Sequence, residues 1–347
     1  PRVSTQQLVI FSRQLATMVA SGIPIVGALE VLSQQIEDRT FRHILRAVTQ
    51  QVQAGASLSE AFAKHPRAFS EFFANMVKAG ESSGRLDEIL DRLAGYLEKA
   101  DVLKRKVQSS LFYPALVSLL AFSITTFLVV VVVPKFKDIF TSLGGKLPMP
   151  TQLLLTASDV LRQYFPVMIG LAVMMAAALR MFLATPIGRA WFDGVKLHVP
   201  LIGPLLQKVA IARFARTLGT LSRSGVPILT SLEIVAKTVG NTLLEQAALA
   251  ARSSIREGAN IADPLAKSRI FPPMVTRMIA IGEKTGELER MLSKIAEFYE
   301  NEVDAAVNAL TSLIEPIIIT VLGLVIGSIV IALFLPVFKI SQLISPY

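Results

Sequence analysis

The stretch Ala79-Gly80-Glu81-Ser82-Ser83-Gly84-Arg85-Leu86 organises the chain, because a second copy of it reads Ile281-Gly282-Glu283-Lys284-Thr285-Gly286-Glu287-Leu288. In both copies an apolar helical pattern runs up to the first glycine, a glutamate follows, and the second glycine opens a new helix. The apolar residues of each new helix recur at the i, i+3, i+4 spacing of one face against a core. Each new helix then runs into a long apolar segment. The repeated unit is therefore a helical domain with its membrane anchor.

The duplication covers most of the chain. Between Phe11 and Glu30, ten residues are identical to the residues 203 positions later, and among them Arg13 corresponds to Arg216 and Glu30 to Glu233. After one deleted residue the offset becomes 202 and continues to Phe136. Chance does not produce identities over so long a register. The sequence therefore predicts two homologous all-α bundles of about six helices each.

Local signals place several helix ends. Gly22-Ile23-Pro24 predicts the end of one helix and the start of the next. Ser57-Leu58-Ser59-Glu60 matches a capping box and predicts a short helix. In the second copy Asp263 is expected to take the N-cap position, with Pro264 in the first turn.

The composition indicates a membrane protein. Of 347 residues 52% are apolar, the mean hydropathy is +0.54, and the apolar excess is concentrated in a few runs. The run from Ala115 to Val133 carries no charged residue, and about 20 helical residues cover the ~30 Å hydrocarbon layer. Residues 316–336 repeat this run. A weaker apolar segment, residues 164–184, is uncharged from Phe165 to Leu179. The sequence predicts three transmembrane helices.

The duplication also predicts the topology. Homologous domains should lie on the same side of the membrane, so an even number of spans must separate them, which supports the weaker segment. Basic residues next to the spans favour cytoplasmic domains. The expected order is a first cytoplasmic domain 1–113, a span 114–134, a periplasmic connector 135–163, a span 164–184, a second cytoplasmic domain 185–315, a span 316–336 and a periplasmic tail 337–347.

Charge and motifs exclude several function classes. We interpret the net charge of +9 as that of a basic membrane protein attracted to anionic lipid head groups. The longest basic run, Lys104-Arg105-Lys106, lies next to a predicted membrane span, which argues against nucleic-acid binding. Cysteine is absent, the three histidines are isolated, and no phosphate-binding loop or nucleophile elbow occurs. We therefore expect no enzyme activity, no cofactor and no catalytic or metal site.

Several candidate residues allow two interpretations. Glu81 and Glu283 either accept backbone N–H groups at the start of the following helix or contact a partner. Arg13 with Glu30, and Arg216 with Glu233, either form ion pairs inside each domain or bind a partner. Gly323 and Gly327 either permit close helix packing or are simply tolerated. The acidic residues near the third span are a solvated helix face or a divalent-cation site: Glu297, Glu300, Glu302 and Asp304.

The motifs resemble a known family. Phe-x-Arg-x-Leu-x-Thr, Ser-Gly-[Ile/Val]-Pro-Ile, Leu-Glu and Gly-Glu-x-x-Gly-x-Leu occur in this order twice, followed by an apolar span between two prolines. From Phe11 to Phe338 this pattern resembles the type II secretion protein F domain family, the inner-membrane platform proteins of type IV pilus assembly and type II secretion. Members of that family usually carry extra residues before the first domain. Because this chain begins at Pro1 rather than at methionine, we expect that a segment precedes it.

The resemblance implies a non-enzymatic platform in the bacterial inner membrane. Such a platform engages a hexameric assembly ATPase, pilins or pseudopilins, other inner-membrane assembly proteins and membrane lipid, and a homo-oligomer is expected. ATPase-driven motion would reach the membrane through the helices that enter it at 103–113 and 303–315. The wording of the motifs favours the pilus, with the type II secretion platform as the alternative. A small membrane transporter is the alternative of another class, but it requires charged groups at mid-membrane that the spans lack.

Overall fold

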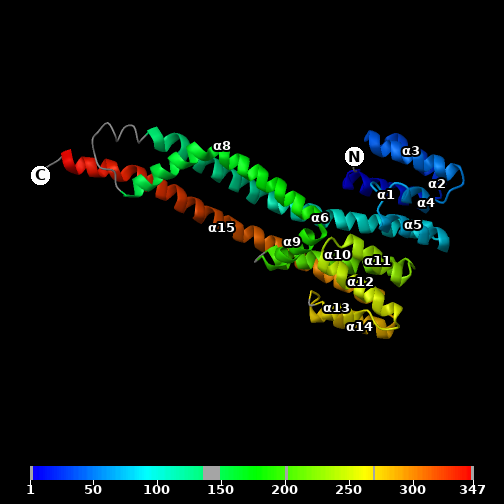
Figure 1. The fold of residues 1–347 in the computed structure, drawn as a ribbon. Helices are drawn as coiled ribbons and strands as arrows, with labels where there is room; N and C mark the ends of the chain where they lie inside the picture. Colours follow the sequence, from blue (N-terminus) through cyan, green and yellow to red (C-terminus); the bar gives the residue numbers. More distant parts are fainter. Residues whose placement is uncertain (1–2, 136–148, 200–201, 269, 345–347) are drawn as a thin grey trace. The chain divides into compact units, whose positions relative to one another are not determined.

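A computed structural model describes residues 3–135, 149–199, 202–268 and 270–344. Every regular element in these ranges is helical, which confirms the all-α prediction (Figure 1). Residues 136–148 of the expected periplasmic connector and residues 345–347 of the expected tail lie outside the described residues.

The first repeat folds into six helices. Their bounds are α1 Thr5–Ala20, α2 Ile25–Gln35, α3 Arg39–Gln53, α4 Leu58–Ala63, α5 Glu71–Ser83 and α6 Leu86–Phe127. Gly22 takes a φ of 83° between α1 and α2, as its position in the sequence predicts. The Ser57 hydroxyl accepts from the Glu60 N–H, which confirms that Ser57 is the N-cap of α4.

The second repeat follows the same order. Its helices are α10 Ile202–Arg223, α11 Ile228–Thr238, α12 Thr242–Arg256, α13 Ala262–Lys267, α14 Pro273–Thr285 and α15 Leu288–Ile344. A further helix, α9 at Pro186–His198, precedes these six at the start of the predicted second domain 185–315. The predicted N-cap was wrong by two positions, because Ile261 precedes α13 and Asp263 lies in its first turn.

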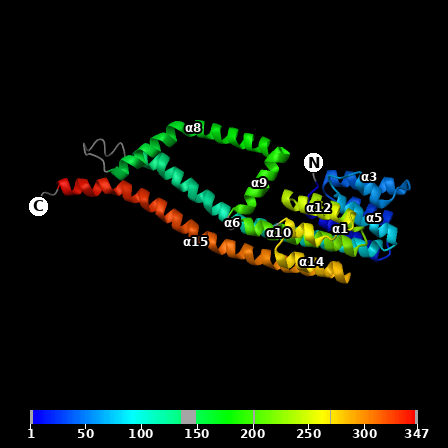
Figure 2. The same cartoon turned by 60° about the horizontal axis from the view of Figure 1, so that its bottom comes forward.

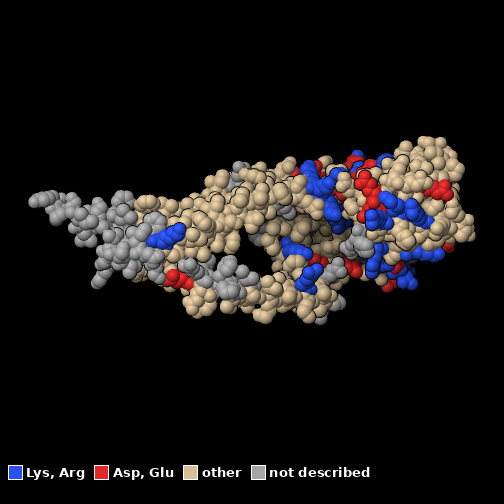
Figure 3. Space-filling view, turned by 90° about the horizontal axis from the view of Figure 1, so that it is seen from above, with Lys and Arg blue, Asp and Glu red and all other residues tan. Residues whose placement is uncertain are grey.

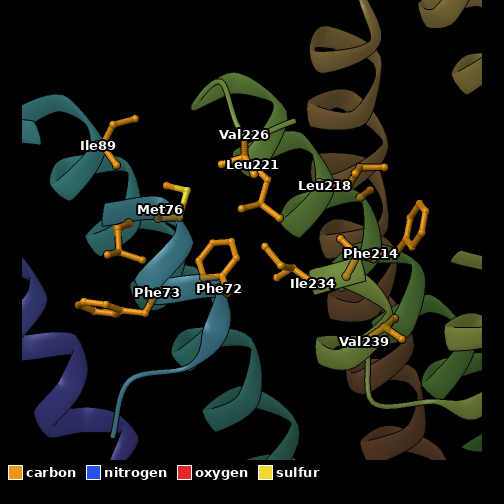
Figure 4. Close-up of a cluster of buried hydrophobic side chains, with 14 of the residues drawn as sticks. Phe72, Phe73, Met76, Ile89, Phe214, Leu218, Leu221, Val226, Ile234 and Val239 are labelled. Carbon is orange, nitrogen blue, oxygen red and sulfur yellow. The ribbon is translucent and has the colours of Figure 1, made fainter. Parts of the chain in front are cut away.

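The chain divides into two compact units. Unit 1 contains Pro1–Lys106 and Ala190–Ala306, and unit 2 contains Val107–Arg189 and Val307–Tyr347. The sequence predicted two homologous bundles. Unit 1 holds both repeats, and their buried residues form one continuous cluster. Figure 4 shows where the repeats meet, with Phe72 and Met76 of α5 facing Leu221 and Ile234 of the second repeat.

Two helices are long and apolar enough to cross a membrane, within 86–135 and 288–335 of the described chain. The count becomes three if helices 191–197 and 202–223, which are bent by 110°, are taken as one span. The weaker apolar segment, residues 164–184, contains a shorter apolar helical stretch, Gly170–Ala184. It belongs to α8, Met149–Ala184, so residues 149–163 of the predicted periplasmic connector are helical.

Unit 2 is held together by a small apolar cluster and two hydroxyl groups. Val129 and Val133 pack with Leu155 of α8 and with Ile329 and Leu333 of α15. The Ser158 hydroxyl donates to the Val129 carbonyl at 2.6 Å, and the Thr151 hydroxyl to the Ala332 carbonyl at 2.5 Å.

The accepting carbonyl of Val129 lies in a π-helical turn, Leu128–Val132, that interrupts the regular helical pattern. Figure 2 shows α8 meeting α6 near this turn and diverging from it farther along. The Ser158 hydroxyl therefore gives this carbonyl a hydrogen-bond partner beside a cluster of apolar side chains, where an unpaired polar group is costly.

The charged residues are unevenly distributed. On the face drawn in Figure 3 the Lys, Arg, Asp and Glu side chains gather over unit 1, and few lie over unit 2. This distribution follows from the apolar spans of the sequence. The charged candidate residues are therefore to be sought in the repeats.

Candidate functional site

Glu81 closes the first repeat by capping a helix that precedes it in the chain. Its carboxylate accepts the N–H of Leu58 at 2.6 Å, the N–H of Ser59 at 3.2 Å and the hydroxyl of Ser59 at 2.5 Å. These N–H groups are unpaired donors of the first turn of α4, and a carboxylate there also interacts favourably with the helix dipole.

Glu283 performs the same task in the second repeat. Its two oxygens accept the N–H groups of Ile261 at 2.6 Å and Ala262 at 3.1 Å, at the start of α13. The sequence interpretation was correct that these glutamates accept backbone N–H groups, but it named the wrong helix. It expected the following helix, whereas Glu81 and Glu283 cap α4 and α13, more than 20 residues earlier.

The helices that carry these glutamates do not end at the first glycine of the motif. α5 continues through Gly80 and ends at Ser83, and α14 continues through Gly282 and ends at Thr285. A Cβ on Gly282 would lie 2.8 Å from the Cα of Leu288, so this glycine allows the next helix to approach closely. The second glycines, Gly84 and Gly286, end the helices in the left-handed conformation with φ of 68° and 73°.

The repeated arginines pair with the long helices and not with the expected glutamates. Arg13 donates from Nε and Nη2 to Glu98 at 2.6 and 2.7 Å and from Nη1 to Asp91 at 2.5 Å. Arg216 donates in the same bidentate manner to Glu300, at 2.8 and 2.7 Å. Each pair joins the first helix of its repeat to the long helix more than 80 residues later. The guanidinium holds the pKa of Glu98 below its usual value and, in return, the pKa of Arg13 is raised.

Glu30 and Glu233, the predicted partners of these arginines, make other contacts. Glu30 accepts from the Gln53 amide at 2.7 Å. Glu233 pairs with Arg252 at 2.8 Å and with Lys237 at 3.2 Å. The predicted Arg13–Glu30 and Arg216–Glu233 pairs were therefore wrong, because each long helix presents a carboxylate closer to the arginine.

Polar contacts between the repeats were not predicted. Lys237 of α11 contacts Glu71 of α5 at 2.9 Å, and this pair, with Glu233, raises the pKa of the lysine. The Tyr96 hydroxyl lies 2.9 Å from the hydroxyl of Thr217, and burial raises the pKa of Tyr96. Identities between the repeats can only indicate contacts that both copies make. The residues of these contacts differ between the copies, so comparing the two repeats could not reveal them.

The small-residue and acidic candidates have distinct surroundings. A Cβ on Gly323 or Gly327 would meet no atom within 4 Å, so no described part of the chain packs on this face of α15. The acidic side chains form ion pairs with Lys294, Arg216, Lys208 and Lys106. Within the described residues no group of three or more acidic or histidine side chains is placed to hold a metal ion.

The sequence pattern of the family described as "Type II secretion system (T2SS), protein F" matches the chain twice, over residues 11–134 and 214–336. These segments coincide with the two repeats and include every residue of the capping and arginine–glutamate contacts. The chain belongs to this family.

Relatives cover nearly the whole chain. It is 43% identical over 99% of its length to the type IV pilus assembly protein PilC of Myxococcus xanthus, covering 82% of that protein. It is 46% identical over 98% of its length to PilC of Thermus thermophilus, covering 84% of that relative. The type II secretion system protein F of Vibrio cholerae is 36% identical over 99% of this chain, with 84% of that protein covered.

Proposed function

We propose that this protein is the inner-membrane platform of a type IV filament machine, coupling a cytoplasmic assembly ATPase to the insertion of pilins into a growing pilus. The near full-length similarity to type IV pilus assembly proteins carries this proposal. A binding and anchoring role agrees with a helical unit whose charged residues make structural ion pairs and with two helices able to cross a membrane.

The proposed topology places unit 1 in the cytoplasm and the C-terminus in the periplasm. It requires a third span, which we assign to residues 164–184, besides 114–134 and 316–336. The grouping of both repeats in unit 1 supports this assignment, because two halves of one compact unit lie on the same side of a membrane.

The glutamates and arginines of the repeats stabilise unit 1 in this proposal and act on partners only through its shape. Unit 1 binds the hexameric ATPase. The spans contact pilins, lipid and other inner-membrane assembly proteins. The open face at Gly323 and Gly327 is suited to close packing against a second copy of α15, which supports a homo-oligomer.

The type II secretion platform is the second candidate, favoured by the similarity to the Vibrio cholerae protein. Complementation separates the two. We expect the gene to restore pili, counted by electron microscopy, in a Thermus thermophilus strain that lacks PilC. In a Vibrio cholerae strain that lacks protein F, we expect no restored secretion. Restoration of secretion alone would support the alternative, and restoration of neither would contradict the platform role.

The long helices provide a test of coupling. α6 is one helix from Leu86 to Phe127, and four alanines inserted after Lys106 preserve a helix and nearly its phase. Four glycines at the same place cost several kcal/mol of helix propensity. We expect the glycine insertion to abolish pili and the alanine insertion to retain most of them, at equal amounts of protein in the membrane. Equal piliation would contradict transmission through the helix.

A further inference from the structure

A cavity of about 210 Å³ lies between the two repeats within unit 1. Its charged lining residues are Arg13, Asp91, Arg92, Lys99, Arg216 and Arg223. The first four belong to the first repeat and the last two to the second. The cavity is therefore complete only when both repeats are present.

Corresponding positions of the two repeats line this cavity. Arg13 corresponds to Arg216 at the offset of 203, and Asp91 corresponds to Ser293 at the offset of 202. The duplicated positions thus bring two arginines to one cavity. The second repeat, however, has a neutral hydroxyl where the first has a carboxylate.

Carboxylates outside the cavity fix the arginines of the second repeat and leave donors unused. Arg216 is held by Glu300 through Nε and Nη2. Arg223 donates from Nε to Glu289 at 2.5 Å and from Nη2 to Ser293 at 3.1 Å. The Nη1 groups of both arginines make no hydrogen bond to the described part of the chain. Two oriented cations with free N–H groups remain at the cavity.

The first repeat adds cations from the other side. Arg92 donates from Nη1 to the Arg223 carbonyl at 2.5 Å, which brings cationic side chains of the two repeats together, and its Nη2 is paired with Glu88. Lys99 is exposed, and its ammonium makes neither an ion pair nor a hydrogen bond within the described residues. The carboxylates of Glu88, Glu98, Glu289 and Glu300, with Asp91 in the lining, pair with the four arginines. Lys99 makes no ion pair of its own within the described residues, and its charge acts only at longer range on Glu297.

We propose that this cavity binds a small phosphate-bearing anion of the size of orthophosphate or pyrophosphate. Guanidinium groups with fixed planes and free N–H groups, together with a lysine ammonium, are the donors that recognise phosphate oxygens. Whole drug-sized ligands occupy about 300–1,000 Å³, so a cavity of this volume accommodates a phosphate group or two and not a nucleotide.

The ligand would strengthen the association of the repeats. An anion bound only when both repeats line the cavity stabilises that arrangement by mass action. This inference goes beyond the proposed function and does not rest on it, since it concerns a binding site inside unit 1 that is independent of the ATPase and of pilins.

Isothermal titration of pyrophosphate into the full chain in detergent micelles, at constant ionic strength, tests the site. We expect saturable binding of one pyrophosphate per chain, with a concentration-dependent rise of the thermal unfolding midpoint. The titration extends to about 10 mM pyrophosphate, which detects dissociation constants up to roughly the millimolar range. If no saturable heat is observed up to that concentration, the proposal is overturned.

The repeats supply their own matched variants. Ser293→Asp gives the second repeat the carboxylate of the first and keeps an acceptor for Arg223, and we expect binding to weaken about tenfold or more. Asp91→Ser removes the carboxylate from the lining, and we expect binding to tighten about tenfold. Opposite shifts in these two variants distinguish a change of cavity charge from a loss of folding.

Lys99→Gln removes the exposed ammonium of the lining and is expected to weaken binding about tenfold. Lys284→Gln, an exposed lysine outside the cavity, is the control and should bind as the unmodified chain does. Circular dichroism confirms that each variant is folded. Unchanged affinity in folded Lys99→Gln and Ser293→Asp would overturn the proposal, because binding would then lie elsewhere on the surface.

A competition experiment identifies the source of the phosphate group. Dihexanoyl phosphatidic acid, kept below its micelle concentration, presents the same chemistry as a lipid head group. Displacement of pyrophosphate by this lipid would support the site and assign it to a head group. Failure of the lipid to displace bound pyrophosphate would support the site as one for a free anion.

Discussion

The two repeats of unit 1 fill equivalent cores with different side chains. In the first repeat five buried phenylalanines contact one another, with ring centroids as close as 4.3 Å: Phe11, Phe41, Phe62, Phe69 and Phe73. The corresponding positions of the second repeat are also buried: Phe214, Leu244, Leu265, Phe271 and Val275. The same core positions therefore accept different apolar side chains in the two copies.

Backbone geometry is not interchangeable in the same way. Both repeats keep the capping glutamate, the glycine at the close helix approach, the left-handed glycine and the arginine–glutamate pair. Each of these depends on a charge or on a missing Cβ at one place, which no other side chain supplies. The comparison teaches that the fold is defined by these few positions, whereas the core requires only apolar side chains of suitable total size.

The largest effect is expected from removing a central ring. Phe69 contacts four other rings, and Phe271 contacts Phe214. Phe69→Ala should lower the free energy of unfolding by about 4–5 kcal/mol and Phe271→Ala by about 3 kcal/mol. Chemical unfolding of the full chain in detergent measures both. An equal or reversed order would show that the aromatic contacts of the first core add nothing to burial.

A methyl group on the buried glycine sharpens the comparison further. The Cβ of Gly282→Ala would lie 2.8 Å from the Leu288 Cα, whereas that of Gly80→Ala would lie 3.0 Å from the tip of the Leu86 side chain and 3.1 Å from the Leu86 Cα, a less tight approach to backbone. We expect a loss of about 2–3 kcal/mol for Gly282→Ala and about 1 kcal/mol less for Gly80→Ala. The same unfolding experiment decides, and a larger loss at Gly80 would mean that the helix approach is tighter in the first repeat.

Neutralising the caps should have an intermediate effect. Glu81→Gln and Glu283→Gln each lose charge-assisted bonds to a helix start, at a cost of about 1–2 kcal/mol. Glu81 also accepts from the Ser59 hydroxyl, and the second repeat has Ala262 at that position. Ser59→Ala should therefore reduce the cost of Glu81→Gln to that of Glu283→Gln. A double-mutant cycle with no coupling between Ser59 and Glu81 would contradict this account.

The smallest effect concerns the half-exposed pair of the first repeat. Arg13 lowers the pKa of Glu98, so the pair stabilises unit 1 above the unfolded-state value of about 4.5, and this contribution is lost as the pH falls through the lowered pKa. Glu98→Gln should cost about 1 kcal/mol or less at pH 7, since side chains this exposed are screened by solvent.

Unfolding at several pH values provides the measurement. The difference between Glu98→Gln and the unmodified chain should shrink as the pH falls below 4.5, and Glu37→Gln, an exposed carboxylate without this pair, is the control. A difference that does not change with pH would rule out the ion pair as its origin.

The sequence predicted the features that local chemistry determines. Helical periodicity, the Ser57 cap, the turn at Gly22 and the apolar segments each depend on neighbouring residues. The structure confirms the helices, the cap and the turn. The repeat register also placed Glu81 and Glu283 in equivalent roles. What failed was the assignment of long-range partners, together with two helix boundaries, at Gly80 and Asp263.

The failures have a common physical reason. Gly80 was taken as a helix end because glycine has low helix propensity, but here it is kept inside a helix for a close approach that only the tertiary structure reveals. The partner of Arg13 was sought on the neighbouring helix, whereas Glu98 lies 85 residues away. The joining of the repeats through Phe72 and Ile234 uses positions at which the two copies have different roles, so the duplication could not indicate it.

Single-cysteine labelling tests the central claim most directly, because the chain has no cysteine. Three variants suffice: Ser82→Cys in the first repeat, Lys284→Cys in the second and Ser345→Cys in the tail. In intact spheroplasts a membrane-impermeant maleimide should label the tail variant alone, and permeabilisation should expose both repeat variants. Labelling of one repeat but not the other before permeabilisation would place them on opposite sides of the membrane and contradict a platform built on both repeats.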